Sequence, residues 1–447
     1  MAGQTISRGR GRGPRVTRVA GLTRLLTQAL VPETATGRRL AVIALIDALG
    51  TGMFLTSAAL YFTRIVGLRA AQVGLGLTVA GLVGLATAVP LGALADRVGA
   101  GRVFIALQAV RGFGFLAYSL VGSFGPFVAV ACLVGAIETV TPPLTVALVG
   151  AAVPEDVRVQ TMARLRAARN VGFGLGALVA TAAIVAGSRG WFVALIVADA
   201  GSFFVTSLGM LRMGMGRLAP TERLGRGGGE GRAVPNLRYL GASLLNGVLA
   251  IHITLLTLGL PLWIAERTRA PLGAVGACVV TNTVLAVALQ AWFARAAARL
   301  RGAARAMLQA GVALGAFCAL ALLDARIASP ALATVVALGS AVALTFGELW
   351  QSAGEWKISY DLADAAHRAR YLSAFQLGSA AQQVAGPLIV TTLVLPHAWG
   401  WAALAGLTLG AGVAFQPLIF GAPATCPSLN AAPNAVPHAA SSEGEIS

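Results

Sequence analysis

Long apolar segments alternate with short polar connections along most of the chain. Each segment has about 20 residues or more, the length that an α-helix needs to cross about 30 Å of hydrocarbon. The segments lack the strict alternation of apolar and polar residues that marks the strands of a membrane β-barrel. The pattern therefore predicts an all-α membrane protein with twelve transmembrane helices. We expect these helices at residues 40–62, 71–94, 103–122, 126–152, 166–187, 191–211, 239–264, 271–294, 303–323, 329–351, 371–395 and 399–420.

The longest internal connection divides the twelve segments into two sets of six. Residues 212–238 carry several arginines and a run of three glycines, which is typical of a flexible cytoplasmic linker. The connections after the second and the eighth segments are both short, basic and rich in Ala and Gly, which forms a faint internal repeat. We therefore expect two pseudo-symmetric six-helix halves, residues 39–211 and residues 239–421.

The two ends of the chain differ from the apolar body. Residues 1–38 form a basic tail in which apolar residues recur at helical spacing, so they form either a helix lying on the inner leaflet or a disordered basic segment. Residues 422–447 are rich in Ala, Pro, Asn and Ser, a composition that predicts a disordered tail.

Composition and charge placement support a membrane protein. Hydrophobic residues make up 57% of the chain and charged residues 11%, with a mean hydropathy of +0.77. The net charge of +17 could suggest a nucleic-acid partner, but 27 of the 34 Lys and Arg residues fall in the tails and around the even-numbered connections. Six fall on the other side, and Arg111 lies inside the third segment. The positive-inside rule then places both termini in the cytoplasm, and no nucleic-acid role is expected.

Four ionisable residues stand in segments 1, 4, 7 and 10, namely Asp47, Glu138, His252 and Glu348. An ionisable side chain inside a membrane is costly and normally faces a partner or a water-filled cavity, so the pattern indicates a polar pathway through a helical bundle. Asp47 and Glu138 are at similar depth, where two nearby carboxylates favour binding of a proton by one of them. His252 is either a helix-packing residue or a residue with a gating or proton role. Glu348 lies close to the predicted cytoplasmic edge, where it lines the inner mouth or snorkels to the interface.

Arg111 is the cation expected to neutralise one of the buried acids. The spacing leaves two partners open, Asp47 in the first segment and Asp199 in the sixth. For Asp199 we expect a structural role in such a pair, since removing one partner would leave the other charge buried alone.

The connection after the second segment carries a motif with Gly92, Asp96, Arg97, Gly99 and Arg102. In spacing and position it resembles the loop motif of the major facilitator superfamily. The resemblance covers residues 40–420 and implies that helices 1, 4, 7 and 10 line a central cavity, with the two halves rocking to give alternating access. It also implies that Asp96 meets the cytoplasmic start of helix 11, where Arg368 and Arg370 are available, as a latch made in one state and broken in the other.

Within that family the chain resembles multidrug and metabolite efflux members, with two departures. The fifth segment has Asn170, a candidate structural residue, followed by closely spaced glycines that suit tight helix packing, but it lacks the proline usual in proton-coupled drug exporters. The fourth segment has Glu138 in a helix where many such exporters have an arginine.

These observations predict a secondary active transporter that exports a drug-like or amphiphilic secondary metabolite in exchange for protons. Proton-coupled import of a solute is the alternative, and a non-transporting membrane sensor or scaffold is a third reading. The chain has no phosphate-binding loop, no nucleophile–base pair and no metal-ligand cluster, so we expect no enzyme activity, no metal and no cofactor, with a proton gradient as the energy source. The 33 Arg against one Lys hint at a GC-rich bacterium, and we expect a monomer in its inner membrane.

Overall fold

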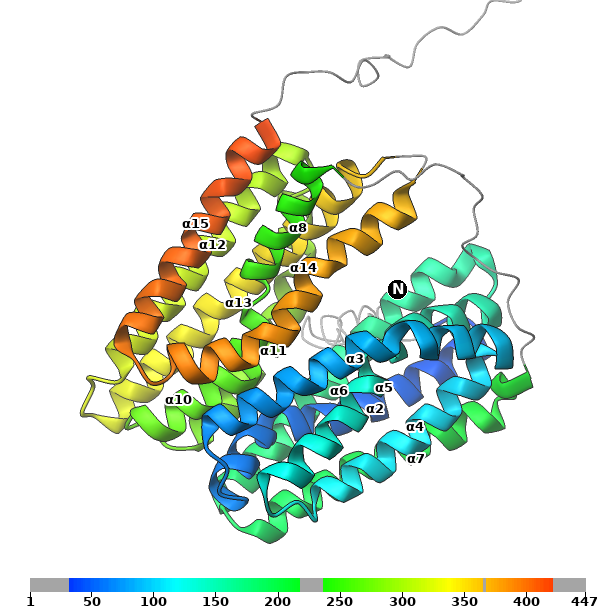
Figure 1. Cartoon of the computed structure of the whole chain (residues 1–447), viewed down its shortest axis with the longest axis horizontal. Helices are drawn as coiled ribbons and strands as arrows, with labels where there is room; N and C mark the ends of the chain where they lie inside the picture. The colour runs from blue at the N-terminus through cyan, green and yellow to red at the C-terminus, as the bar shows by residue number, and fades with distance from the viewer. Residues whose placement is uncertain (1–31, 218–235, 365–366, 421–447) are drawn as a thin grey trace, which may run out of the picture.

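The computed structural model describes residues 32–217, 236–364 and 367–420, and within these ranges every regular element is a helix (Figure 1). Twelve helical spans in this part of the chain are long and apolar enough to cross a membrane, which confirms the predicted number. The first six spans are α2 (Ala35–Leu60) with η1 (Tyr61–Ile65), α3 (Ala70–Val98), α4 (Ala100–Tyr118), α5 (Phe124–Ala152), α6 (Glu155–Ala186) and α7 (Arg189–Arg212), followed by the short η2 (Met215–Arg217).

The seventh span is divided into four consecutive pieces. These are α8 (Leu237–Leu249), α9 (His252–Thr254), η3 (Leu255–Gly259) and α10 (Leu260–Arg267). The remaining spans are α11 (Gly273–Ala296), α12 (Leu300–Asp324), α13 (Pro330–Asp361), α14 (Arg368–Ile389) with η4 (Val390–Val394), and α15 (Ala398–Phe420).

Local sequence explains where several helices begin and end. The hydroxyl of Thr34 accepts a hydrogen bond from the backbone amide of Gly37 at 3.0 Å, and Asn236 caps α8 in the same way through the amide of Tyr239 at 2.8 Å. Pro330 occupies the first turn of α13, where its missing amide hydrogen leaves no bond unmade. Gly187 ends α6 with a φ of 66°, a conformation that glycine adopts without strain.

Each half contains a close crossing of two helices at glycines. In the first half α2 packs along α6, and a Cβ on Gly176 would overlap the carbonyl oxygen of Leu49. In the second half α8 packs against α14, and a Cβ on Gly247 would overlap the carbonyl oxygen of Gly378. The first and fifth spans thus meet in the same manner as the seventh and eleventh, as expected of two pseudo-symmetric halves. The crossing also confirms that the fifth-span glycines serve tight packing.

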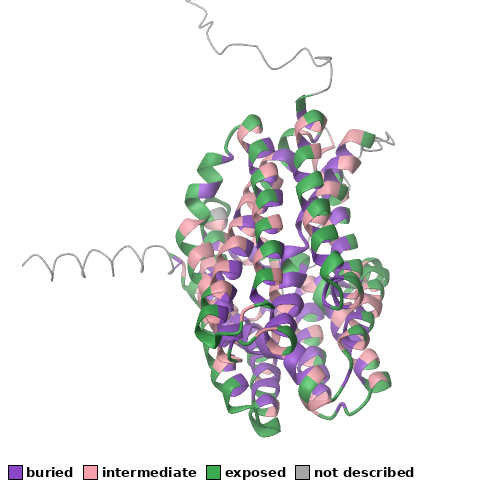
Figure 2. Ribbon diagram, turned by 90° about the vertical axis from the view of Figure 1, so that its left-hand side faces the viewer, coloured by how far each residue is buried: buried purple, intermediate pink, exposed green. Residues whose placement is uncertain are grey.

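The outer faces of the helices carry the exposed apolar side chains. Figure 2 shows exposed residues along the outside of the bundle and buried residues between the helices. Large apolar side chains such as Val89 and Phe113 are exposed there, a surface suited to lipid tails rather than water. The chain is a multi-pass membrane protein.

Among the described residues, the main contacts between the two halves lie on one side of the molecule. The contacts join the first part of α3, from Gly74 to Gly81, to residues 384–391, and the last part of α6 to the first part of α11. Arg64 donates a hydrogen bond to the carbonyl oxygen of Ala265 at the same side, at 2.6 Å. On the other side, where α2 and α8 begin and where α7 and α15 end (here the terminal side), the halves diverge (Figure 1).

Two helices are longer on the terminal side than the apolar pattern predicts. Helix α6 begins at Glu155 instead of residue 166, and α13 ends at Asp361 instead of residue 351. Charged residues end the apolar segments there, but they do not end the helices. In α13, for example, Lys357 and Asp361 form an (i, i+4) ion pair at 3.0 Å that stabilises the extension.

The motif between the second and third spans is almost entirely helical. Gly92, Asp96 and Arg97 lie on the last turns of α3, Arg102 lies on the first turn of α4, and only Gly99 stands between the helices, with a φ of 105°. Gly99 therefore provides the tight turn, whereas Gly92 does not. The predictions for the basic tail before residue 32, for most of the linker and for the tail after residue 420 lie outside the described residues.

Candidate functional site

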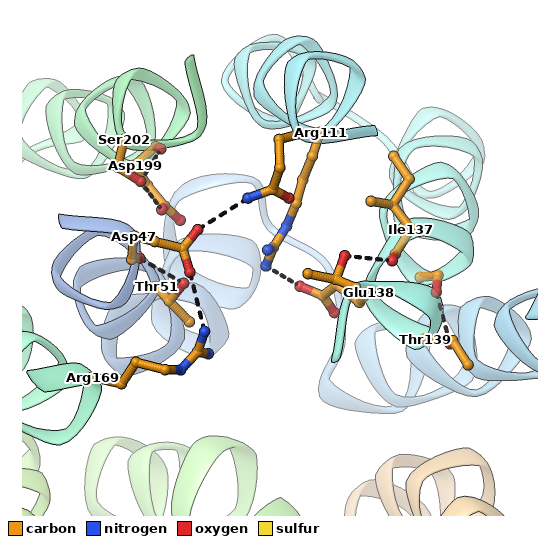
Figure 3. A network of polar contacts seen from close by, with 12 residues as sticks. Asp47, Thr51, Arg111, Ile137, Glu138, Thr139, Arg169, Asp199 and Ser202 are labelled. Atoms are coloured by element: carbon orange, nitrogen blue, oxygen red, sulfur yellow. Dashed lines mark hydrogen bonds and ion pairs between the residues drawn. The ribbon is translucent and has the colours of Figure 1, made fainter. Parts of the chain in front are cut away.

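The first half holds a cluster of charged side chains at the level of Asp47, between α2, α4, α5, α6 and α7 (Figure 3). The Asp47 side chain is buried, with 7% of the residue exposed. Its Oδ1 accepts a hydrogen bond from Nε2 of Gln108 at 3.2 Å, and its Oδ2 pairs with Arg169 at 3.5 Å. Asp47 is thus a paired carboxylate, which reduces the cost of burying its charge.

Arg111 pairs with Glu138, and neither of the two expected partners is correct. Its Nη2 lies 2.6 Å from Oε1 of Glu138, with side chains 8% and 49% exposed respectively. The guanidinium also stacks over the ring of Phe203, 4.1 Å from its centroid. The sequence fixes depth but not the direction in which a side chain points around its helix, so the register of α5 against α4 could not be foreseen.

Asp199 is the third acid of this cluster, and it is fully buried in α7 with 0% exposure. Its Oδ1 accepts a hydrogen bond from the hydroxyl of Ser202 at 3.3 Å. A Cβ on Gly50 would overlap the Asp199 carboxylate, so the absence of a side chain at this position lets α7 approach α2. In the described part of the chain Asp199 forms no ion pair.

Two partners of Asp47 were not foreseen. Arg169 falls near the start of the predicted fifth segment and was not considered as a partner, but the longer α6 places it well inside the helix, with a half-exposed side chain. Gln108 lies three residues before Arg111, so both side chains are directed to the same side of α4. The spacing of Gln108 and Arg111 in an otherwise apolar helix is the sequence feature from which Gln108 could have been predicted to join the cluster.

A small pocket adjoins this cluster. It is lined mainly by apolar residues of α2, α4, α5, α6 and α7, including Leu40, Ile43 and Met210, with a polar group formed by Asp47, Gln108, Thr141, Thr145, Arg169 and Thr206. An apolar wall with a few convergent polar groups is typical of a site for a small organic molecule.

The second half contains uncharged polar side chains in place of the arginines. Nε2 of His252 lies 3.3 Å from Oε1 of Gln351, and Nε2 of Gln351 donates to Oδ1 of Asn246 at 2.8 Å and to Oε2 of Glu355 at 2.9 Å. Nδ2 of Asn246 in turn donates to the hydroxyl of Ser379 at 3.3 Å. His252 is buried and begins α9, directly after the interruption of the seventh span.

Glu348 does not lie at the edge of its helix. Because α13 continues to Asp361, Glu348 is well inside the helix and half-buried. Its Oε2 accepts a hydrogen bond from Nδ2 of Asn282 in α11 at 2.7 Å, which links two helices of the second half. Glu348 and His252 therefore have different hydrogen-bond partners: Glu348 is bound by Asn282, and His252 contacts Gln351.

The proposed latch is open in this structure. Asp96 is exposed on the last turn of α3, and no ion pair to it occurs in the described part of the chain. Arg368 instead donates to the hydroxyl of Tyr360 at 2.8 Å and stacks over its ring. Arg102 donates to the carbonyl oxygen of Gly216 at 3.1 Å, which ties the motif to the segment after α7.

Asn170 follows Arg169 on α6 and is partly buried. Its neighbours Gly172 and Gly176 pack against the backbone of α2. Its side chain contributes no contact to the charged cluster in the described structure.

Comparisons with known proteins agree with this architecture. Residues 40–238 match the family model of the Major Facilitator Superfamily. Among solved structures, the chain is similar to the nucleoside transporter NupG, with a TM-score of 0.66 and 14% identity over 87% of this chain and 100% of the other. It is also similar to a peptide transporter POT in complex with sulfate, with a TM-score of 0.70 and 14% identity over 88% and 97%. No curated protein sequence matches the chain.

Twelve spans in two matching halves, with a polar cluster among their helices, define a secondary-transporter fold rather than an enzyme. The first half of the chain matches the model of this family, and the described chain as a whole has the fold of major facilitator transporters.

Proposed function

We propose that the protein exports a small amphiphilic compound from the cytoplasm in exchange for protons. The observation that carries this proposal is the charged cluster of Asp47, Glu138, Arg111 and Arg169, set beside a largely apolar pocket. Carboxylates that exchange arginine partners can bind and release protons as the protein changes state, and the apolar wall suits a lipophilic solute.

The same proposal includes orientation and setting. The excess of arginine on the terminal side favours a cytoplasmic position for both termini, so the diverging ends of the halves would face the cytoplasm. We expect a monomer in the inner membrane of a bacterium, with the proton gradient as the energy source and no cofactor.

A second candidate, proton-coupled import of a polar solute, is favoured by the second half. Asn246, His252 and Gln351 form a connected set of hydrogen-bond donors and acceptors. Asn282 of α11 adds another amide, which donates to Glu348 of α13. Such amides suit a solute rich in hydrogen-bonding groups. The nucleoside and peptide transporters of similar fold make uridine and a dipeptide reasonable probes.

The test is transport by the purified protein in liposomes with an imposed pH gradient. The probes are tetraphenylphosphonium as a lipophilic cation, uridine as a neutral polar solute, and a dipeptide. We expect tetraphenylphosphonium to accumulate against the proton gradient, and we expect Asp47→Asn to abolish this accumulation, since the variant removes the charge that Arg169 and Gln108 hold.

The outcomes separate the candidates. Accumulation of uridine or the dipeptide along the proton gradient would favour import and overturn export. Transport of every probe at the same rate with and without the gradient would overturn proton coupling. Asp156→Asn, an exposed acid on the first turn of α6, serves as the control and should transport normally.

A further inference from the structure

Asp199 differs from the other two acids of the charged cluster because it has no cation of its own. Asp47 pairs with Arg169, and Glu138 pairs with Arg111. Asp199 is fully buried, its Oδ1 receives only the Ser202 hydroxyl, and its Oδ2 has no hydrogen-bond partner. In the described part of the chain no Lys, Arg or His forms an ion pair with it.

An ionised carboxylate in such a place is strongly disfavoured, whereas the protonated acid is neutral and can be buried. We propose that Asp199 is the site that holds the coupling proton, and that its occupancy decides which carboxylate Arg111 pairs with. This assignment rests on the proposed proton coupling and adds to it, because it places the bound proton on α7 rather than on Asp47 or Glu138.

Arg111 is positioned to respond to the proton. Its guanidinium stacks on Phe203, which follows Asp199 by one turn of α7, while Nη2 holds Glu138. The charged groups that face Asp199 are Arg111 from α4, Asp47 from α2 and Glu138 from α5, with Arg169 of α6 bound to Asp47. Arg111 is therefore the cation that can pair with Asp199 when Asp199 loses its proton.

The exchange can be written as a single proton transfer. In the proposed protonated state the proton is bonded to Oδ2 of Asp199, and Arg111 pairs with Glu138 as in this structure. When the proton passes to a water molecule, the Oδ2–H bond breaks, its electron pair stays on the carboxylate, and Arg111 turns from Glu138 toward Asp199. The side chain of Glu138, which is half-exposed, is then released.

Two residues that line the pocket have buried polar atoms without a partner, and one of them, Thr206, shares α7 with Asp199. Oε1 of Gln108 and the hydroxyl of Thr206 are buried without a hydrogen-bond partner, and both residues also line the pocket beside Asp47. Buried polar groups of this kind commonly hydrogen-bond to ordered water, which can conduct a proton. Such water molecules would lie between α2, α4 and α7, since α7 packs against both of the other helices.

The direct test is infrared spectroscopy of the protein in liposomes as the pH is varied, with no solute added. The wild type should show the carbonyl band of a buried protonated carboxylic acid that disappears as the pH rises. Both variants are made in an Asp324→Asn background, because Asp324 is a second buried aspartate with an unpartnered oxygen. In that background the band should be missing at every pH in Asp199→Asn and present in Asp47→Asn. A band that survives in Asp199→Asn, or that Asp47→Asn removes, would overturn the assignment.

Transport of tetraphenylphosphonium supplies the second measurement. Asp199→Asn should lose at least about tenfold of its gradient-driven accumulation while still exchanging the cation across the membrane without a gradient, a split that misfolding would not produce. The matched control is Asp324→Asn, since Asp324 is a buried aspartate of the second half with an unpartnered Oδ1, and it should keep gradient-driven accumulation.

The two proposals fail in different ways. Wild-type transport that ignores the gradient would overturn the proposed function together with this role of Asp199. Gradient-driven transport by the wild type that persists in Asp199→Asn would overturn only the assignment to Asp199. Loss of accumulation in both Asp199→Asn and Asp324→Asn would also count against it, because any buried aspartate would then matter equally.

Discussion

At the scale of single residues, the charges inside the membrane are arranged as pairs whose two members differ in exposure. Arg111 is nearly buried, whereas Glu138 is about half-exposed. A buried guanidinium that loses its carboxylate is left as an uncompensated charge. Substitutions of the two members of a pair should therefore have non-additive effects on the free energy of unfolding. This dependence is what a switching role for Arg111 requires.

We predict a strong coupling between Arg111 and Glu138. In a double-mutant cycle of Arg111→Gln and Glu138→Gln, the free energy of unfolding in mixed micelles should deviate from additivity by about 1–3 kcal/mol, with the double variant more stable than the sum predicts. The pair of Lys357 and Asp361, 3.0 Å apart with both side chains partly exposed, is the control and should show a coupling below about 1 kcal/mol. Equal couplings for both pairs would contradict the prediction.

At the scale of helices, the two halves are in contact at two places where a glycine of one half packs against a threonine of the other. A Cβ on Gly276 of α11 would overlap the Thr181 hydroxyl of α6, and a Cβ on Gly74 of α3 would overlap the Thr391 hydroxyl of η4. The second and eighth spans thus each provide a glycine, and the fifth and eleventh spans each provide a threonine. Close packing at small residues is the main source of affinity between helices in lipid, so these positions should control how firmly this side is closed.

We predict that Gly276→Ala pushes the halves apart on the side opposite the termini. The measurement is the distance between spin labels at Ser123→Cys and Ala328→Cys, in a chain whose native cysteines are replaced; both positions are exposed at the start of spans on that side. The distance distribution should shift to longer values. Gly339→Ala is the control, because nothing lies within 4 Å of its added Cβ. An unchanged distribution in Gly276→Ala would show that the contact does not hold this side closed.

At the scale of the whole molecule, the proposed transport cycle requires a second state in which the terminal ends of the halves meet. The halves meet on one side and diverge on the terminal side (Figure 1). The first part of α3 contacts α14 and η4, whereas Asp96 lies near the other end of α3. A latch between Asp96 and the start of α14 would require the terminal ends to come together. Such an ion pair can bias an equilibrium between two global states only if it exists in one of them.

We predict that Asp96→Asn abolishes tetraphenylphosphonium transport while expression and membrane insertion remain normal. The variant leaves the described structure intact, since Asp96 is exposed and unpaired here, but it removes the charge needed in the other state. Arg97→Gln, which changes the adjacent exposed residue, should retain most of the activity. Normal transport by Asp96→Asn would rule out the latch.

The sequence alone determines the class of the molecule, because the free-energy cost of burying charges and unpaired backbone groups in lipid leaves very few structures that can cross a membrane. Twelve apolar segments predicted twelve helices, and the motif from Gly92 to Arg102 indicated the family. The ionisable residues were also visible, since any charge in an apolar segment is conspicuous. The helix ends at Glu155 and Asp361 were missed, because hydropathy reports where lipid contact ends and not where a helix ends.

Only the tertiary structure decided which charges meet. Pairing depends on the rotation of each helix about its axis and on its register with its neighbours, and these are set by packing at positions such as Gly50 and Gly176. Arg111 therefore pairs with Glu138, Arg169 with Asp47, and Asp199 with no cation in the described chain. A sequence lists the charges in the membrane, but the packing of the helices determines which of them remains unpaired.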